Sequence, residues 1–384
     1  MQKELYDVVV VGAGIVGCSV SYHLARSGLK VALLDKGSVA GEATQAAAGM
    51  LAPLADEPPD EEHPLQQLAL AALRYYDGLD EQLQQETGID IGLVKVPTLR
   101  PAFDEQGRTR LQAILTQQQQ FLPGLQWLEG SSAHELDPLL PETVQGALLS
   151  PYERNVQAAQ ITLAYARGAV TRGASLVEGC PVGRLILQGQ RAVGVQTAQG
   201  SMYAEAIVLA AGAWASQWHT SRPSPPIFPV KGQMLALQAL PGLQLRHTVY
   251  ASGVGGIVPK ADGTIYVGAT VEQVGFDKGV TAEGIATLLT ALTKLTPVLS
   301  KARVLRTWAG LRPRSADGFP LIGPSRSVQG LWIAGGHFRD GILLGPLTGH
   351  IIAELIQKHS TPFDLNVHAF DPDRFGGWKP DHLV

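Results

Sequence analysis

The first 35 residues contain a glycine motif that constrains the fold more than any other part of the chain. An almost continuously apolar segment, residues 5–11, is followed by Gly12, Gly14 and Gly17 in the pattern G-x-G-x-x-G, and Asp35 ends the next apolar segment. The first glycine allows a tight turn, the second lets backbone approach a pyrophosphate, and the third lets a helix pack closely on the strand. A carboxylate at position 35 suits a ribose diol and would repel a 2′-phosphate, which disfavours NADP. The motif therefore predicts a βαβ dinucleotide-binding unit.

Length and composition limit what is attached to that unit. A chain of 384 residues fits about two domains. Its 45% hydrophobic and 17% charged residues can form a sizeable core, and a net charge of −4 offers no basic field for nucleic acid. Cys18 and Cys180 cannot build a disulfide framework, and no His, Cys or carboxylate cluster has metal-ligand spacing. We expect a folded protein with no metal site and no nucleic-acid partner.

The N-terminus and the apolar segments bear on the cellular location. The first apolar strand begins within about five residues, which leaves no room for a signal peptide. No apolar run reaches the roughly 18 to 20 residues of a membrane-spanning helix. The sequence favours a soluble, cytoplasmic protein with no membrane partner.

Two further strand-to-glycine junctions occur far from the first. Residues 206–210 form a buried strand that leads into Gly212, and the strand in residues 331–335 leads into a glycine-rich loop and a helix expected to begin near Gly345. Residues 65–85 have helical spacing and predict one amphipathic helix, whereas 91–103 and 144–150 resemble strands.

The spread of these junctions predicts interleaved domains. One nucleotide-binding domain would be assembled from distant segments, while the hairpin-rich intervals form another layer. We expect an α/β chain with a Rossmann-like domain and an α+β substrate domain built on an antiparallel sheet. The first comprises residues 1–85, 151–225 and 305–384, and the second comprises 86–150 and 226–304.

Two arginines in glycine-rich, mostly apolar settings are candidates to hold a substrate carboxylate. A guanidinium can bind a carboxylate through two parallel charge-assisted hydrogen bonds, which suits Arg312 and Arg339. The alternative for each is a structural salt bridge. Arg314 is expected at the surface, paired with Asp317. The loop residue His337 is a candidate base, although packing or hydrogen bonding is the commoner role of such a histidine.

Several motifs together resemble a known family. They are VVVVGAGIVGCSVSYHLARSGLKVALLDK, ATQAAAGML, PVKGQML, GLRPRSADGFPLIG and GGHFRDGILLGPLTG. Their order resembles that in the D-amino-acid oxidase and glycine oxidase group of FAD-dependent amine oxidoreductases, and the match is nearest to the glycine oxidases of thiamine biosynthesis. The resemblance covers nearly the whole chain.

The resemblance implies which residues bind cofactor and substrate. It implies non-covalent FAD, because neither cysteine lies in the late glycine-rich segment where related sarcosine oxidases attach their flavin. It implies substrate contacts from Arg312, Arg339, Met50, Gly256 and Val271. The implied FAD-binding residues, with the glycines of the three junctions, are Gly12, Gly14, Ile15, Val16, Gly17, Asp35, Lys36, Ala43, Thr44, Ala48, Gly49, Met50, Val182, Gly212, His337, Phe338, Arg339, Asp340, Gly341, Ile342 and Leu343.

Two positions depart from the family pattern. Gly256 stands where glycine oxidases can carry a tyrosine that contacts the substrate carboxylate, and Val271 stands where a methionine can line the amine pocket. Both changes leave room in the pocket. Alternatively, the neighbouring glycines let the loop fold inward so that Tyr250 replaces the missing contact.

The resemblance implies oxidative deamination of a small amino acid by FAD, which gives an imino acid, and reoxidation by dioxygen to hydrogen peroxide. Hydride transfer from a neutral amine needs no protein base, which agrees with the lack of an acid–base pair. Glycine is the first substrate, with sarcosine and small D-amino acids next. A dimer or tetramer and a functional link to thiazole synthase are also implied. The alternatives are a dehydrogenase that uses another electron acceptor, and a non-catalytic nucleotide-binding module.

Overall fold

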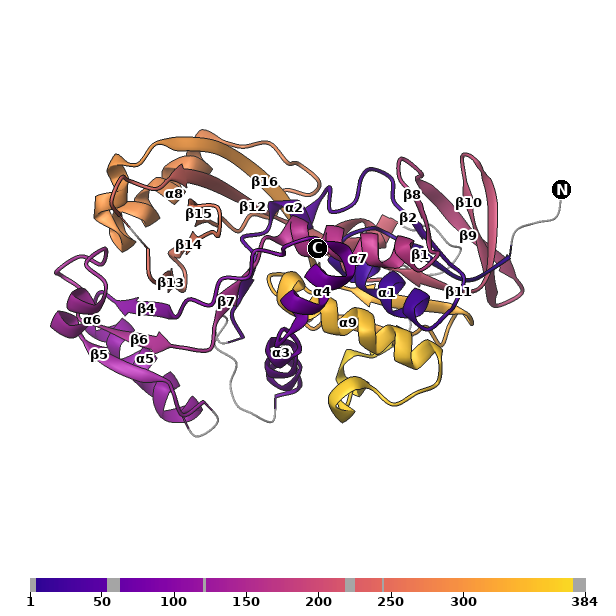
Figure 1. Ribbon diagram of the computed structural model, residues 1–384, viewed down its shortest axis with the longest axis horizontal. Helices are drawn as coiled ribbons and strands as arrows, with labels where there is room; N and C mark the ends of the chain where they lie inside the picture. Colours follow the sequence, from indigo (N-terminus) through magenta and orange to yellow (C-terminus); the bar gives the residue numbers. More distant parts are fainter. Residues whose placement is uncertain (1–4, 54–62, 120–121, 218–224, 244, 376–384) are drawn as a thin grey trace.

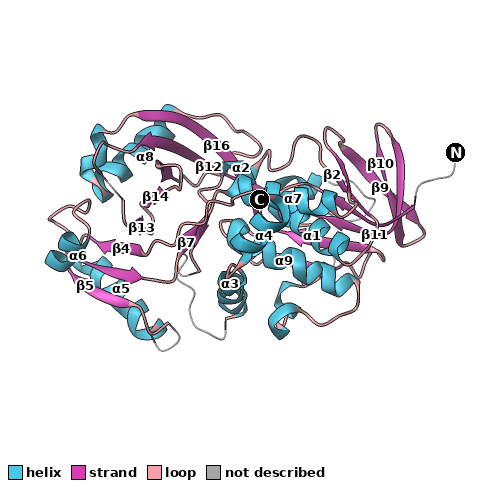
Figure 2. Ribbon diagram, in the orientation of Figure 1, coloured by secondary structure: helices cyan, strands magenta, loops and turns pink. Residues whose placement is uncertain are grey.

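Two eight-stranded sheets divide the computed structural model into two lobes that lie side by side (Figure 1). The structure describes residues 5–53, 63–119, 122–217, 225–243 and 245–375. Figure 2 shows that each lobe combines strands with helices, and that α2 (Ala43–Ala46) and β7 (Arg154–Asn155) lie near the junction of the lobes. The mixed α/β class expected from the sequence is confirmed.

The first sheet is built around β1 (Leu5–Val11), which pairs in parallel with a strand on each side. Val8 and Val10 pack with helices on one face, whereas Val9 and Val11 pack on the other face with the β9–β10 hairpin. Because both faces are covered, the run of valines needs no alternation with polar residues. The strand order is β17-β18-β11-β1-β2-β8, with β10 paired to β11 and β9 paired to β10. The other strands are β2 (Val31–Leu34), β8 (Ser175–Val177), β9 (Val182–Gln188), β10 (Arg191–Thr197), β11 (Gly200–Leu209), β17 (Leu321–Pro324) and β18 (Leu331–Gly335).

Helix α1 (Ile15–Arg26) packs against its neighbours through small residues. A Cβ atom at Gly349 of α9 (Gly341–Ile356) would lie 2.3 Å from the Ser19 Oγ, and that hydroxyl donates to the carbonyl of Pro346 at 2.8 Å. Close approach of the two helices therefore depends on glycine. The other helices of this lobe are α3 (Pro64–Tyr75), α4 (Leu79–Thr87) and α7 (Ala158–Thr171), with the short 3-10 helices η1 (Gly212–Gln217), η3 (Pro362–Asp364) and η4 (His368–Phe370).

The second sheet has the order β16-β12-β15-β14-β13-β4-β6-β5 and is antiparallel except between β13 and β4. Along β12 (Ile227–Gln238), Leu235 and Leu237 pack toward α8 (Ala282–Leu295), whereas Met234 and Ala236 pack with Met50 of the first lobe. One face of this sheet thus packs against α8, and the other face packs against the first lobe. The remaining elements are β4 (Thr98–Ala102), β5 (Gln126–Glu129), β6 (Gly146–Ser150), β13 (Thr248–Ala251), β14 (Gly255–Pro259), β15 (Thr264–Gly268), β16 (Val304–Ser315), α5 (Glu105–Gln118), α6 (Gly130–Leu136) and η2 (Pro297–Lys301); β3 (Met50–Leu51) pairs with β7.

Three local expectations differ from the structure. The helix expected over 65–85 is divided into α3, which ends at Tyr75, and α4, which begins after the N-cap Gly78 with a φ of 79°. The strand expected over 91–103 is confined to β4, and the helix expected near Gly345 begins at Gly341. The domain boundary proposed at 305 falls at the start of β16, which pairs with β12 in the second sheet. We therefore propose that the last segment of the nucleotide domain begins after β16.

Among the described residues, no helix has both the length and the apolar content that a membrane crossing requires.

Candidate functional site

A cavity of about 1020 Å³ lies between the two lobes. Its walls come from the glycine turn after β1, the end of β2, residues 41–52, residues 210–217 and the loop before α9 in the first lobe. The second lobe contributes parts of β12, β13, β15 and β16. All three strand-to-glycine junctions of the sequence therefore converge on one space.

The glycine turn forms the part of the wall nearest to α1. Gly12 has a φ of +105°, and a Cβ atom there would lie 2.3 Å from the carbonyl oxygen of Ala210. A Cβ at Gly17 would lie 1.8 Å from the carbonyl oxygen of Gly12, so both glycines are needed for packing. Gly12 and Gly14 both line the cavity. The N-terminus of α1 therefore reaches the cavity with its partial positive charge, which suits a phosphate group.

Asp35 is held at the rim by two backbone amides. Its Oδ2 accepts from Ala13 N at 2.7 Å, and its Oδ1 accepts from Gly37 N at 2.7 Å. These bonds fix the carboxylate between the glycine turn and the end of β2. Each carboxylate oxygen has a further lone pair, so the group can also accept hydrogen bonds from ribose hydroxyls.

Lys36 and Trp214 together form a wall of the cavity, of which the sequence analysis expected Lys36 and missed Trp214. The Lys36 Nζ lies 3.2 Å from the centre of the Trp214 ring, and burial lowers the pKa of this lysine. Glu42 forms ion pairs with Lys36 at 3.6 Å and with Lys278 of the second lobe at 2.9 Å. The position of Trp214 directly after the second strand-to-glycine junction was the available signal for its place in the cavity.

The small-residue segment 43–50 is bound to the second lobe. Trp308 Nε1 donates to the carbonyl of Ala46 at 3.0 Å, and Lys260 Nζ donates to that of Ala48 at 2.8 Å. A Cβ atom at Gly310 would lie 2.3 Å from the Cβ of Ala46. The small side chains of this segment thus allow β16 to approach it.

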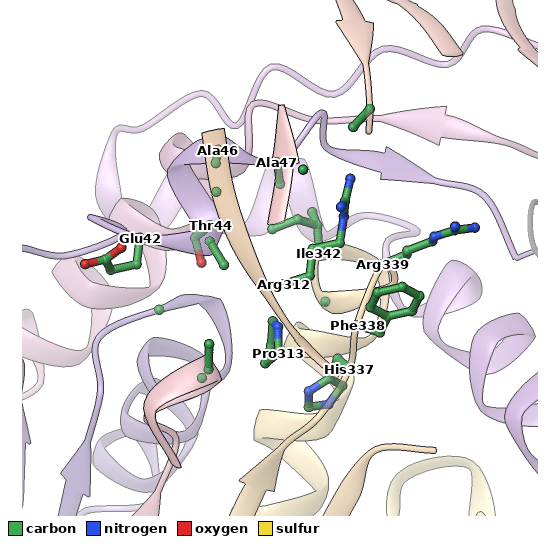
Figure 3. A pocket seen from close by; sticks show the side chains of 18 of the residues that line it. Glu42, Thr44, Ala46, Ala47, Arg312, Pro313, His337, Phe338, Arg339 and Ile342 are labelled. Carbon is green, nitrogen blue, oxygen red and sulfur yellow. The ribbon is translucent and has the colours of Figure 1, made fainter. Parts of the chain in front are cut away.

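The third junction presents the start of α9 to the cavity. Residues 337–342 line the space, and Phe338 N donates to the carbonyl of Pro313 at 2.7 Å, which ties the loop to β16. The His337 ring lies apart from the labelled arginines (Figure 3) and its Nε2 is 3.0 Å from the Thr348 hydroxyl. Burial lowers its pKa to about 4, so the ring is neutral at physiological pH.

Both candidate arginines line the cavity. Arg312 on β16 crosses β12 at Gly232, where a Cβ atom would lie 2.3 Å from its Nη1. The same Nη1 donates to the carbonyl of Thr270 at 3.1 Å. Arg339 lies beside Phe338, with the guanidinium carbon 5.2 Å from that ring's centre (Figure 3). The two cations therefore reach the same cavity from different elements.

The expected pairing of Arg314 with Asp317 is wrong. Asp317 instead accepts from Arg374 Nε at 2.7 Å, and the Arg314 guanidinium lies 5.4 Å from the Phe338 ring centre. The partner of Asp317 comes from the C-terminal segment, and spacing along the sequence did not indicate this pairing.

Tyr250, not Gly256, lines the cavity. The two residues face each other across β13 and β14, and a Cβ atom at Gly256 would lie 3.3 Å from the Tyr250 Cδ2. The tyrosine ring therefore packs over the space beside Gly256. Val271 lines the mouth of the cavity and is 54% exposed.

Most residues singled out from the sequence line this cavity. Three do not: Gly17 packs against the glycine turn, Leu343 is buried in α9, and Gly256 lies beside Tyr250. The remaining ones all do, namely Gly12, Gly14, Ile15, Val16, Asp35, Lys36, Ala43, Thr44, Ala48, Gly49, Met50, Val182, Gly212, Val271, Arg312, His337, Phe338, Arg339, Asp340, Gly341 and Ile342.

The residues that line the cavity fit a dinucleotide. The N-terminus of α1, Gly14 and the Asp35 carboxylate, which two backbone amides hold in place, all lie at this cavity. In the part of the chain that the structure describes, no group of three His, Cys, Asp or Glu side chains is arranged to hold a metal ion.

Comparisons with known proteins agree with this geometry. A family model described as FAD dependent oxidoreductase matches residues 7–355. Glycine oxidase of Geobacillus kaustophilus is 36% identical over 362 residues, which are 94% of this chain and 95% of that protein. A crystal structure of glycine oxidase from the same organism has a TM-score of 0.91 at 34% identity and covers 97% of this chain and 99% of that one.

Two further relatives have other names. The bifunctional protein ThiO/ThiG of Trichormus variabilis is 33% identical over 366 residues, 94% of this chain and 54% of that longer protein. Iminodiacetate oxidase of a Chelativorans species has a TM-score of 0.86 at 29% identity, covering 95% of this chain and 98% of that one. The resemblance stated from the motifs is confirmed.

Proposed function

The chain belongs to the FAD dependent oxidoreductase family, and from this we propose that it oxidises glycine and similar small amino acids to imino acids. The observation that carries the proposal is the position of Arg312, which lines the same cavity as the dinucleotide turn. A carboxylate bound there would hold a small amino acid beside the cofactor. The enzyme is a flavoprotein, and the choice of substrate is the part that we propose.

We propose that FAD is held mainly by backbone. Gly14 and the N-terminus of α1 would face the pyrophosphate, and Asp35 would accept from the ribose. The N-terminus of α9, at Gly341, carries partial positive charge that suits an electron-rich flavin ring. Cys18 is buried and donates through its Sγ to the carbonyl of Ala13, and Cys180 is a buried residue of the cavity wall beside Val182. Neither lies in the loop before α9, where related sarcosine oxidases attach their flavin, so we expect non-covalent binding.

We propose that Arg312 binds the substrate carboxylate and that the Tyr250 hydroxyl assists it. The carbonyl of Thr270 fixes one edge of the guanidinium, which pre-orients the planar group. Arg339 supplies a second cation in the same cavity. When bound, FAD supplies the two-electron chemistry, taking a hydride from the α-carbon and passing the electrons to dioxygen, which gives hydrogen peroxide.

The protein's own contribution is binding and orientation, not proton transfer. Hydride can leave the α-carbon only after the amine has lost its proton, and a neutral amine needs no protein base at that step. His337 does not serve as one in this proposal, because its ring is buried against Thr348. The amine would therefore lose its proton to solvent at the open mouth near Val271.

The fusion of ThiO with ThiG in a relative supports a metabolic context. We propose that the imino acid formed from glycine supplies thiazole synthesis in thiamine biosynthesis. A dehydrogenase that passes electrons to another acceptor is the alternative, and the cavity residues would be the same for both.

An amino-acid panel tests the proposal. We expect the purified yellow protein to release hydrogen peroxide with glycine, and its flavin to bleach under anaerobic conditions. Bleaching without peroxide in air would identify a dehydrogenase, and no bleaching with glycine, sarcosine or D-alanine would refute the proposal. Acid precipitation should release the colour into solution; flavin retained on the pellet would contradict non-covalent binding.

A further inference from the structure

Helix α9 contains a proline in its interior, at Pro346. The helix begins at Gly341, and its first intrahelical bond is donated by Leu344 N to the carbonyl of Asp340 at 2.8 Å. A proline has no N–H group, so the carbonyl four residues earlier, that of Ile342, receives no bond from the helix. Ile342 is buried, and a buried carbonyl without a donor is unfavourable. The first turn of α9 therefore needs a donor from another element.

Tyr76, at the end of α3, supplies this donor. Its hydroxyl donates to the carbonyl of Ile342 at 2.5 Å, and the tyrosine is fully buried. Burial raises the pKa of Tyr76, so the hydroxyl keeps its proton. The turn that follows α3 is held by Arg154 of β7, whose Nη2 lies 2.6 Å from Asp77 Oδ1. The donor thus comes from a turn that is itself fixed by an ion pair.

The neighbouring Tyr75 binds α9 at a second point. Its hydroxyl lies 3.2 Å from His350 Nδ1 of α9 and 3.0 Å from His23 Nε2 of α1. His350 follows Ile342 by about two helical turns. Ile342 lines the cavity and is labelled in Figure 3, whereas neither histidine lines it. Two adjacent tyrosines therefore bind the same helix, and only the contact made by Tyr76 lies at the cavity.

We propose that Tyr76 is a positioning residue of the flavin site, because its hydroxyl replaces the hydrogen bond that Pro346 cannot donate and so fixes the first turn of α9 against the flavin. The inference rests on the proposed position of FAD at the start of α9. The N–H groups of Gly341 and Ile342 precede the first intrahelical bond, and both residues line the cavity. Their partial positive charge stabilises a reduced flavin, which is more electron-rich than the oxidised form. A first turn that loses the bond from Tyr76 shifts these donors and weakens that stabilisation.

The test measures two properties of the cofactor that require no substrate. One is the dissociation constant of FAD from the apoprotein, followed by flavin fluorescence, and the other is the midpoint potential of the bound flavin, read against a redox dye. Tyr76→Phe removes only the hydroxyl, so it should raise the dissociation constant by about three- to tenfold and make the potential more negative. Unchanged values in this variant would overturn the inference.

Tyr75→Phe is the matched control, because it removes the hydroxyl of the adjacent residue, which contacts α9 away from the cavity. It should leave the dissociation constant of FAD within about twofold of the parent and the potential unchanged. Equal effects of the two variants would mean that α3 acts on the cofactor through general packing, and the inference would fail.

Pro346→Ala supplies the N–H group that the helix lacks and so provides a rescue. Added to Tyr76→Phe, it should bring the dissociation constant of FAD back to within about twofold of the parent and restore the potential. A double variant that still behaves like Tyr76→Phe would show that Tyr76 does not act through the Ile342 carbonyl, which refutes the inference.

Gly341→Asp tests the position of the cofactor separately. It places a negative charge at the start of α9, where a Cβ atom would make only an ordinary contact of 3.8 Å with the His337 Cβ. The charge should weaken FAD binding and make the potential more negative, because it opposes the partial positive charge of the helix. If both quantities ignore it, the proposed position of FAD is refuted, whatever the result for Tyr76.

Discussion

The nucleotide half and the substrate half of the cavity have walls of different kinds. In the nucleotide half, formed by the first lobe, the glycine turn after β1 and the starts of α1 and α9 bring backbone to the wall, beside the side chains of Asp35, Lys36 and Trp214. In the substrate half, formed by β12, β13, β15 and β16, long side chains cross from one strand to the next, as Arg312 does over Gly232. A wall of backbone is sensitive to added atoms, whereas a wall of side chains is sensitive to removed ones.

Changing one glycine of the nucleotide half should have the largest effect. In Gly17→Ala the new Cβ would lie 1.8 Å from the carbonyl oxygen of Gly12, and no flexible side chain can move to relieve the contact. We expect a loss of about 3 kcal/mol or more in the free energy of unfolding and little FAD in the purified protein. Denaturant unfolding and the ratio of absorbance at the flavin and protein bands would measure both. Gly183→Ala, with a nearest contact of 3.6 Å, is the control. A stable, yellow Gly17→Ala protein would contradict the packing argument.

Removing one side chain from the substrate half should leave the fold intact and reduce catalysis. Arg312→Ala leaves a substrate carboxylate without its cation, which should lower kcat/KM for glycine by about 30- to 5000-fold. FAD content should change little, because the nucleotide half does not use this side chain. Arg303→Ala, at an exposed position, serves as the control. Near-normal turnover by Arg312→Ala would make Arg312 structural and Arg339 the first candidate.

The same contrast explains which parts the sequence could predict. The nucleotide half follows from spacing within short segments, so Gly12, Gly14 and Asp35 could be placed from the motif alone. The substrate half depends on which strands become neighbours. The ion pair between Lys231 and Glu272 joins residues 41 positions apart, and no local pattern marks it.

Two errors have a similar cause. The helix expected over 65–85 was predicted from its apolar spacing, although Gly78 within it adopts a left-handed conformation and divides it. The exchange of Gly256 for Tyr250 at the cavity wall depends on the register between β13 and β14, which places the ring over the glycine. Register is set by tertiary pairing and could not be read from the loop sequence.

Tyr250 offers a finer test of the substrate half. Tyr250→Phe should raise the KM for glycine by about 10- to 100-fold if its hydroxyl donates to the carboxylate, with kcat less affected. Gly256→Tyr should disturb the same ring, because its Cβ would lie 3.3 Å from the Tyr250 Cδ2. Kinetics on glycine, sarcosine and D-alanine would measure both variants. An unchanged ranking of substrates in Gly256→Tyr, with no gain in glycine affinity, would show that this position does not shape the pocket.

His337 should show the smallest effect on activity, because its ring is buried beside the Thr348 hydroxyl. We expect His337→Gln to keep kcat/KM for glycine at pH 8 within about threefold of the parent. Its effect should appear in stability instead. Burial lowers its pKa from 6.5 to about 4, so the unfolded chain binds a proton more readily than the folded protein does. The stability contribution of the neutral ring is complete above pH 6.5 and is lost as the pH falls toward 4, which amounts to about 3 kcal/mol.

Urea unfolding of the holoenzyme at pH 4.5 and pH 7.5 measures this difference. The free energy of unfolding should fall more on acidification in the parent than in His337→Gln. His23 and His350, whose pKa values are also lowered by burial, cause a part of the fall that is common to both proteins. An equal loss in the two proteins would mean that the His337 ring takes up its proton without unfolding. In that case the ring would be accessible to solvent and could exchange protons with the cavity, and the division between a backbone wall and a side-chain wall would fail at the loop where the two halves meet.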